Sequence, residues 1–430
     1  MLSYRIDGGN KLRGEVINSG SKNAALPILA TAILNPKPVT FYNVPDIDDI
    51  KTTIKILRLL GCKIDRECDK ITISSDKINK TEIPEDLMHR CRSTVILVGA
   101  LIGRFKEATF SFPGGCNIGA RPIDLHIKAL KKLGVNFTEK NDKITCSSDI
   151  IRGTKIRLDF PSVGATENII LSAVYAKGVT HIINAAKEPE IKDLANCLNK
   201  MGAKVFGAGT EKITIIGVQK LYSIGYRIMP DRIEAGTYLC SAAITGGRIT
   251  LTQANPQSLI NILYTLKSMG CKVSITNNSV SLSAPKIIKP ISIETEPHPG
   301  FPTDLEPIFT SVLTRASGKS SVRENIFESR FEFCKELNKM GANIEILENG
   351  RKINISPTNK IIGKKVKSKD LRGGASLVLE GLVAEGTTIV EGAQYILRGY
   401  EKLEEKLRKL GANIELIKEW LFYEERNKRT

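Results

Sequence analysis

One short pattern recurs six times along this chain of 430 residues and constrains its fold more than any other feature. The pattern is an apolar residue, a glycine, two variable residues and a second apolar residue, as in LGCKI from Leu60 and LGANI from Leu410. Its glycines stand at positions 61, 134, 202, 270, 341 and 411, at intervals of 73, 68, 68, 71 and 70 residues. Near-equal spacing is typical of a repeated structural unit. The sequence therefore predicts six similar units.

The sequence of each unit predicts two helices and several strands. The glycine follows an amphipathic helix, as with Tyr400, Leu403 and Leu407 at helical spacing, and supplies its left-handed cap. A strand follows, and in most units a second alternating strand such as ITIS from Ile71. A more apolar helix comes next, such as 24–34 or 375–384, and then another strand such as TTIVEG from Thr387. This order of elements predicts an α/β protein.

The two ends of the chain share one unit. The sixth unit stops after Ile417, before its second strand, and the segment 4–16 resembles the missing part. We therefore predict that residues 1–21 complete the sixth unit. Two domains of three units follow, residues 22–229 and residues 1–21 with 230–430, joined by a hinge near 20–22 and 229–230.

Composition excludes several classes of protein. With 41% hydrophobic and 25% charged residues, and with neither a signal peptide nor an apolar run near the ~18 residues of a membrane span, we expect a cytoplasmic protein without membrane contact. The nine cysteines make no C-x-x-C pair, and we expect neither disulfides nor a metal. Most of these thiols are expected to be small buried hydrophobes. The net charge of +17 is spread along the chain, which favours a lysine-rich solvated surface over nucleic-acid binding.

Unusual polar residues gather where the apolar helices begin. A helix N-terminus offers free N–H groups and suits phosphates. Capping accounts for Ser162, Thr303 and Asp304. It does not account for Lys22, Arg92 or Arg372, because cations are unfavourable at that end of a helix. These three cations predict a bound anion.

The segment SFPGGCNIGARPIDLHI, residues 111–127, is too rich in glycine to form a core element. Arg121 lies five residues beyond Cys116 and favours the reactive thiolate. A cysteine on such a loop can also be incidental, and the residues alone leave both readings open.

Several motifs in order carry a family resemblance. They include SGSKNAALPILA (19–30), PGGCNIGARPIDLH (113–126), PHPGFPTD (297–304), FESRF (327–331) and DLRGGASL (370–377). The chain resembles the UDP-N-acetylglucosamine 1-carboxyvinyltransferases, a family of enolpyruvyl transferases. The resemblance implies two similar domains, each of three repeats forming an inside-out α/β barrel. It also implies transfer of the enolpyruvyl group of phosphoenolpyruvate to the 3-hydroxyl of UDP-N-acetylglucosamine without a cofactor. This is the first committed step of peptidoglycan synthesis, and hence serves cell-wall biogenesis, cell shape and cell division.

The resemblance also implies roles for individual residues. Cys116 is the loop cysteine that protonates the methylene carbon of phosphoenolpyruvate or otherwise assists turnover, and it is the expected target of fosfomycin. Asp304 is the general base, and Lys22, Arg121 and Arg398 clamp the phosphate and carboxylate. Asn23, Arg330 and Arg372 complete the phosphoenolpyruvate site. The expected sugar-nucleotide contacts are Asn23, Arg92, Arg121, Pro122, Ile123, Asp124, Leu125, Ser162, Val163, Gly164, Asp304 and Ile326.

Three other functions remain as alternatives. The related transferase that acts on shikimate 3-phosphate shares the six-unit fold but lacks a comparable cysteine loop. A relative of similar design acts on RNA ends, and the four isolated histidines of this chain form no nucleophile motif for it. A noncatalytic sugar-nucleotide-binding paralogue would have no reason to keep Cys116, Asp304 and Arg398 together. One departure from the family is Phe160, where some relatives carry a lysine on the uridine side.

Overall fold

The computed structural model describes residues 2–114, 123–358 and 360–418. These residues belong to two compact units, one drawn from residues 1–19 and 230–430 and the other from residues 20–229. Each unit has a hydrophobic core of its own. One core is built from residues within 24–228, and the other from residues within 4–16 and 233–414.

Three apolar helices form the centre of the unit of residues 20–229, and they contact one another. They are α1 (Lys22–Leu34), α4 (Ile96–Phe105) and α6 (Val163–Ala173). The amphipathic helices are α2 (Asp48–Leu60), α5 (Asp124–Lys132) and α7 (Pro189–Lys200), and the short helices α3 (Glu85–Arg90) and η1 (Arg92–Val95) precede α4.

The described strands of this unit form three sheets, β13-β3-β5-β4, β6-β8-β7 and β11-β12-β10-β9. Their bounds are β3 (Val39–Tyr42), β4 (Lys63–Glu67), β5 (Lys70–Ser74), β6 (Glu107–Ser111), β7 (Asn136–Lys140), β8 (Lys143–Ser147), β9 (Lys155–Arg157), β10 (Val179–Ile183), β11 (Lys204–Phe206), β12 (Lys212–Ile216) and β13 (Gly225–Arg227).

The second unit repeats this plan. Its central helices, which also contact one another, are α8 (Arg232–Ile244), α10 (Glu306–Leu313) and α12 (Leu371–Gly381). Its other helices are α9 (Ile260–Ser268), α11 (Cys334–Lys339), α13 (Ala393–Ile396), α14 (Leu403–Lys409), η2 (Pro256–Leu259), η3 (Thr303–Leu305), η4 (Arg330–Phe333) and η5 (Glu348–Gly350).

Three further sheets among the described residues complete this unit, β15-β16-β14-β2, β17-β18-β20-β19 and β21-β22-β1-β23. Their bounds are β1 (Leu2–Asp7), β2 (Arg13–Ile17), β14 (Arg248–Thr252), β15 (Lys272–Ile275), β16 (Ser279–Ser283), β17 (Ser292–Glu294), β18 (Ser320–Arg323), β19 (Asn343–Leu347), β20 (Lys352–Ser356), β21 (Lys365–Lys367), β22 (Thr387–Glu391) and β23 (Asn413–Lys418).

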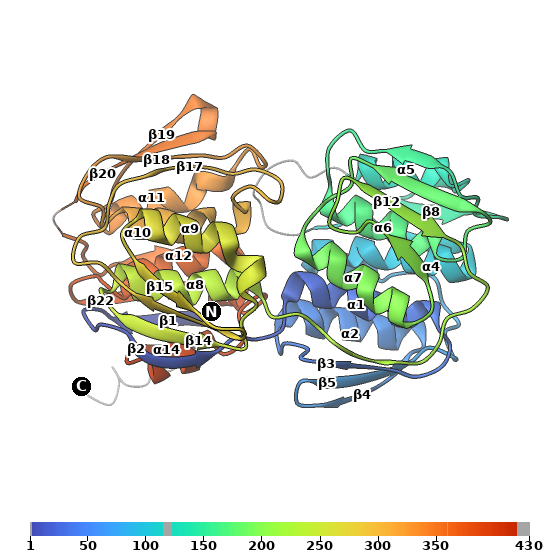
Figure 1. Ribbon diagram of the computed structural model, residues 1–430, viewed down its shortest axis with the longest axis horizontal. Coiled ribbons are helices and arrows are strands. Elements are labelled where there is room, and N and C mark those ends of the chain that lie inside the picture. The colour runs from blue at the N-terminus through green and yellow to red at the C-terminus, as the bar shows by residue number, and fades with distance from the viewer. Residues whose placement is uncertain (1, 115–122, 359, 419–430) are drawn as a thin grey trace. The chain divides into compact units, whose positions relative to one another are not determined.

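The N-terminal strands lie among C-terminal elements, as the blue ribbons of β1 and β2 show in Figure 1. β1 pairs antiparallel with β22 and β23, so it supplies the second strand that the sixth repeat lacks. β2, which also lies within residues 1–21, pairs in parallel with β14 of the fourth repeat. β13 pairs in the same way with β3 of the first repeat. A parallel strand from the last repeat thus closes each ring of three.

The repeat glycines end their helices as predicted. All six have a positive φ, between 91° and 113°. At Gly61, which caps α2, an added Cβ would lie 2.4 Å from the carbonyl oxygen of Lys77. A side chain there would meet this clash as well as the ~1–2 kcal/mol that L-residues lose in the left-handed region. At Gly61, both the backbone conformation and the close carbonyl oxygen therefore favour glycine.

Burial shows which layer lies inside. Every residue of α8 and α12 is buried, whereas strands such as β8 alternate between exposed and buried residues. Helices therefore form the interior and sheets the exterior, which confirms the inside-out α/β arrangement. The eight cysteines of the described ranges are free thiols, and only Cys68 among them is exposed. Among the same residues, none of the helices combines the length and hydrophobicity that a membrane span requires.

Candidate active site

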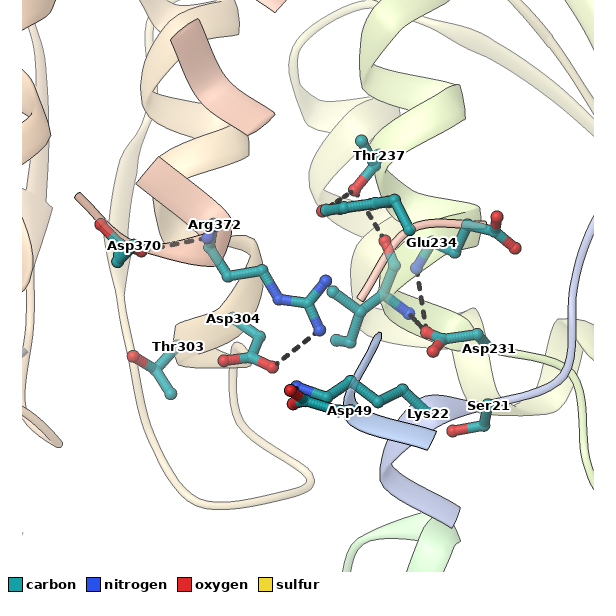
Figure 2. Close-up of polar contacts among 12 residues, drawn as sticks. Ser21, Lys22, Asp49, Asp231, Glu234, Thr237, Thr303, Asp304, Asp370 and Arg372 are labelled. Atoms are coloured by element: carbon teal, nitrogen blue, oxygen red, sulfur yellow. Dashed lines mark hydrogen bonds and ion pairs between the residues drawn. The ribbon is translucent and has the colours of Figure 1, made fainter. Parts of the chain in front are cut away.

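Lys22 is the first residue of α1, and its ammonium group is held by a buried carboxylate. The Ser21 side chain caps this helix by accepting a hydrogen bond from the backbone N–H of Ala24, 3.2 Å away. Lys22 Nζ lies 2.8 Å from Asp49 Oδ2, and the two side chains are only 12% and 3% exposed. We call these two residues the lysine pair; Figure 2 shows both side chains. Asp49 balances a cation that the start of a helix disfavours.

The expected sugar-nucleotide residues of this unit stand at helix starts. Arg92 begins η1 and Asp124 begins α5, directly after buried Ile123 and before half-buried Leu125. Ser162 caps α6, accepting from the N–H of Ala165 at 3.3 Å, and Val163 and Gly164 open that helix. The predicted cap at Ser162 is confirmed. Backbone N–H groups at such starts are suited to phosphate oxygens.

His126 ties two of these helix starts together. Asn168 Oδ1 accepts from the N–H of Gly99 at 2.8 Å, so the amide nitrogen of Asn168 donates to His126 Nδ1 at 2.7 Å. Burial, and then the charge of Arg92, lower the pKa of His126 to about 4. The neutral ring therefore carries its proton on Nε2, beside Gly164, where an added Cβ would lie 3.3 Å from that nitrogen.

In the other unit, one carboxylate is shared by two buried arginines. Arg330 Nη2 donates to Asp304 Oδ1 at 3.3 Å, and Arg372 Nη2 donates to Asp304 Oδ2 at 3.1 Å. Both arginine side chains are 3% exposed, and the Asp304 side chain is 30% exposed. Figure 2 shows the contact between Arg372 and Asp304. We call Asp304, Arg330 and Arg372 the arginine cluster.

Several donors of the arginine cluster have no partner among the described residues. They are Arg330 Nε, Arg372 Nε and Arg372 Nη1, all buried. The rings of Phe327 and Tyr400 lie 5.8 and 5.2 Å from the guanidinium carbons of Arg330 and Arg372. Although burial opposes the charged form, Tyr400 and Asp304 raise the pKa of Arg372 above its ordinary value. Two permanent cations with three buried donors to spare suit a small multivalent anion.

The start of α8 has a different balance of charge. Asp231 caps it by accepting from the N–H groups of Ile233 and Glu234 at 2.7 and 2.9 Å. Figure 2 shows the contact between Asp231 and Glu234. Glu234 Oε1 lies 2.7 Å from Lys406 Nζ and Glu234 Oε2 accepts from the N–H of Ser19 at 2.6 Å. Burial raises the pKa of Glu234, and Lys406 opposes that rise. Glu234 is thus an internally paired group and no counterpart of the arginine cluster.

The remaining expected residues fall into two groups. Asn23 and Ile326 are half-buried, and Arg398 lies half-buried in the turn between α13 and α14. Cys116, Arg121 and Pro122 lie outside the described residues.

Two expectations about capping were wrong. Neither Thr303 nor Asp304 is an N-cap, because Pro302 and Leu305 precede η3 and α10. Asp304 accepts from arginines instead, and Thr303 donates its hydroxyl to Glu324 at 2.9 Å. Asp304 therefore binds arginines that the tertiary structure brings close to it, although its place at a helix start favours capping.

Two buried carboxylates were missed by sequence reasoning. Asp49 could have been found, because it shares a helical face with Thr53, Ile56 and Leu60, all buried. Glu324 follows β18 and is completely buried, but it stands in no pattern that sets it apart.

The comparisons with known proteins cover nearly the whole chain. A family model described as EPSP synthase (3-phosphoshikimate 1-carboxyvinyltransferase) matches residues 6–407. UDP-N-acetylglucosamine 1-carboxyvinyltransferase 2 of Caldanaerobacter subterraneus subsp. tengcongensis is 50% identical, over 96% of this chain and 99% of the relative. The UDP-N-acetylglucosamine 1-carboxyvinyltransferase of Endomicrobium trichonymphae is 46% identical, over 96% and 98%.

Solved structures agree on the fold. The enolpyruvyl transferase NikO of Streptomyces tendae has a TM-score of 0.88 at 23% identity, covering 96% of this chain and 98% of its own. EPSP synthase of Acinetobacter baumannii has a TM-score of 0.75 at 18% identity, covering 97% and 100%. With the family model and the identities above, these findings show that the chain belongs to the enolpyruvyl transferase family, which includes EPSP synthase and UDP-N-acetylglucosamine 1-carboxyvinyltransferase.

Proposed function

We propose that this protein transfers the enolpyruvyl group of phosphoenolpyruvate to the 3-hydroxyl of UDP-N-acetylglucosamine and releases phosphate, the first committed step of peptidoglycan synthesis. Relatives at 42–50% identity bear the name of this activity. The match spans 96–97% of the chain. The family model is named for the transferase that acts on shikimate 3-phosphate, which makes that compound the rival acceptor.

The arginine cluster is the observation that carries this proposal. Phosphoenolpyruvate bears a phosphate and a carboxylate, and planar guanidinium groups pair with both in fork geometry. The three buried donors of Arg330 and Arg372 without a partner among the described residues suit such an anion. We assign Lys22, Asn23, Arg121 and Arg398 to the same substrate.

The reaction is an addition followed by an elimination. Asp304 accepts the proton of the sugar 3-hydroxyl. At the same time, the oxygen of that hydroxyl forms a bond to carbon 2 of phosphoenolpyruvate. The electron pair of the double bond takes a proton at carbon 3, with Cys116 as the acid or as another aid to turnover. The carbon 2–phosphate oxygen bond then breaks, carbon 3 loses a proton, and the double bond forms again. The cationic groups stabilise the charge that shifts toward phosphate.

The sugar nucleotide is assigned to twelve residues, several of which stand at helix starts. The assigned residues are Asn23, Arg92, Arg121, Pro122, Ile123, Asp124, Leu125, Ser162, Val163, Gly164, Asp304 and Ile326. Helix N-termini favour a diphosphate. Phe160, which is 41% exposed, stands where some relatives have a lysine. We therefore expect this position to contact the uridine part of the sugar nucleotide through its aromatic ring and not through a charge.

The proposal includes inhibition, location and movement. Fosfomycin is expected to bond covalently with Cys116. Cys116→Asp should retain some turnover and escape labelling, as intact-protein mass spectrometry would show; stoichiometric labelling of that variant would count against the assignment. Two phosphorylated, water-soluble substrates suit an enzyme of the cytoplasm. A hinge near residues 20–22 and 229–230 is part of the same proposal.

Phosphate release is the measurement that tests the function. The protein is supplied with phosphoenolpyruvate and either UDP-N-acetylglucosamine or shikimate 3-phosphate, without added metal. Release with the sugar nucleotide alone is expected. Release with shikimate 3-phosphate alone would overturn the acceptor, and sugar-nucleotide binding with no release from either would favour a noncatalytic paralogue.

A further inference from the structure

Glu324 holds two segments of the chain with one carboxylate. It follows β18 and is completely buried. Its Oε2 accepts a hydrogen bond from the hydroxyl of Thr303 at 2.9 Å. Its Oε1 accepts from the backbone N–H groups of Ile326 and Phe327 at 2.7 and 3.0 Å. Three donors from two segments thus converge on a single side chain.

Both segments lead directly to the arginine cluster. Thr303 precedes Asp304, and the carbonyl oxygen of Thr303 accepts from Arg330 Nη2 at 3.1 Å, the nitrogen that also reaches Asp304. On the other side, the Phe327 ring lies 5.8 Å from the guanidinium carbon of Arg330. Glu324 therefore fixes the backbone on which Asp304 stands and the ring against which Arg330 rests.

Further contacts keep Glu324 from moving. Its own N–H donates to the carbonyl of Arg351 at 2.9 Å, and the N–H of Asn325 donates to Thr295 Oγ1 at 3.0 Å. A buried carboxylate whose backbone is fixed has few alternative positions. The groups that hydrogen-bond it are therefore held in place as well. An ordinary turn would need only the two backbone bonds; the bond to Thr303 goes beyond them.

We propose that Glu324 is a positioning residue, which sets Asp304 for proton abstraction and Ile326 for the acceptor by binding both of their segments. This role rests on the function proposed above. Glu324 touches neither substrate in this account. Without it, Thr303 and the N–H groups of Ile326 and Phe327 lose a buried acceptor, and the segment of Asp304 is free to shift.

Two pairs of variants separate geometry from charge. Glu324→Ala removes all three bonds, and we expect kcat to fall about 100-fold, the size of effect that a 1 Å misplacement can have. Glu324→Gln keeps the shape, because its oxygen can accept from both N–H groups while its amide donates to Thr303. We expect this variant to recover most of kcat. Thr303→Val removes only the hydrogen bond between Thr303 and Glu324 and should lower kcat about tenfold. Thr303→Ser keeps the hydroxyl and should restore kcat.

The measurements are kcat, the KM of each substrate, the kcat–pH profile and the melting temperature. Glu380→Gln is the control, since it replaces another completely buried glutamate whose carboxyl group hydrogen-bonds a threonine, 2.9 Å from Thr314 Oγ1. The role predicts that the Glu324 and Thr303 variants have a lower kcat, a shift of the acid limb of the kcat–pH profile and a higher KM for UDP-N-acetylglucosamine. In the control, kcat and both KM values should not change. If Glu324→Ala does not fold, the pair at Thr303 decides.

Two outcomes would overturn the role. One is wild-type kcat in both Glu324→Ala and Thr303→Val. The other is a loss that merely follows melting temperature and appears equally in Glu380→Gln. A wild-type protein inactive with UDP-N-acetylglucosamine would instead overturn the proposed function, so the two failures are distinguishable.

Discussion

The lysine pair and the arginine cluster balance buried charge differently. In the unit of residues 20–229, one cation faces one carboxylate, Lys22 with Asp49 at 2.8 Å. In the other unit, the carboxylate of Asp304 hydrogen-bonds both Arg330 and Arg372. Asp370, Glu306 and Glu324 also act electrostatically on Arg330, and Asp231 does so on Arg372. A buried charge without compensation is costly. The lysine pair therefore places a counter-charge directly against its cation, whereas the arginine cluster keeps three buried donors for a further anion.

The comparison suggests separate duties for the two groups. Asp49 holds an ammonium group at a helix start where the dipole disfavours it, so the lysine pair orients a charge. The arginine cluster keeps buried guanidinium donors that have no partner among the described residues, so it is suited to bind an anion. Substitutions in the two groups should therefore differ in whether stability or turnover suffers.

The largest effect is expected at the shared carboxylate. Asp304→Asn removes the proposed base, and we expect kcat to fall by about 10²–10⁴-fold, the usual contribution of general base catalysis. Phosphate release gives kcat, and calorimetry should show that UDP-N-acetylglucosamine still binds. Near-normal turnover would mean that Asp304 is not the base, and the arginine cluster would then have no catalytic role to set against the lysine pair.

The next effect concerns the geometry of the guanidinium group. Arg372→Lys keeps the charge but loses the planar fork, so we expect KM for phosphoenolpyruvate to rise about 10–100-fold, equivalent to one or two lost charge-assisted bonds. The control is Arg323→Lys, at an exposed arginine that pairs with Glu348. An unchanged KM in Arg372→Lys would mean that the arginine cluster does not bind that substrate.

The lysine pair should respond mainly in stability. Asp49→Asn leaves Lys22 without its counter-charge, and we expect the free energy of unfolding in urea to fall by about 1–3 kcal/mol, with a several-fold loss of kcat. Asp48→Asn in the same helix is the control, because its side chain is 46% exposed. If Asp49→Asn were as stable as this control, the lysine pair would lack the anchoring role.

The smallest effects involve pH. Burial raises the pKa of Glu380 to about 8, so its contribution to stability is complete at low pH and is lost as pH rises from about 4.5 toward 8. Burial lowers the pKa of His126 to about 4, so its contribution is complete above about 6.5 and is lost as pH falls toward 4. Glu380→Gln should therefore raise the melting temperature by a few degrees near pH 8 and by little near pH 5. An equal change at both pH values would contradict this account.

Much of the fold follows from local rules. The six repeat glycines have positive φ because a helix must turn into a strand at each, and this requirement is visible in LGCKI or LGANI. Strand order needed more. The segment 4–16 resembles the tail of a repeat, but nothing local says that β2 pairs with β14 rather than continuing beside β1.

Some residues of the candidate site could also be recognised from the local sequence, whereas others could not. Lys22 and Arg372 were recognisable because a cation at a helix start conflicts with the dipole. Asp304 was expected to cap, as its local position favours, but the arginines that bind it come from 26 and 68 residues away. Glu324 could not have been singled out, since its importance lies in the groups that the folded chain brings to its two oxygens.

The pairing of β1 with β23 has a consequence for synthesis on the ribosome. Residues Leu2 to Asp7 find partners at Lys418 to Asn413, so the first strand to emerge waits for nearly the last. At ordinary translation rates this wait is roughly 20–80 s. Residues 20–229 can fold in the meantime, while Tyr4 and Ile6, completely buried in the finished protein, remain open to solvent or chaperones. Nascent chains stalled before β23 should therefore contain one folded half and one unfinished sheet.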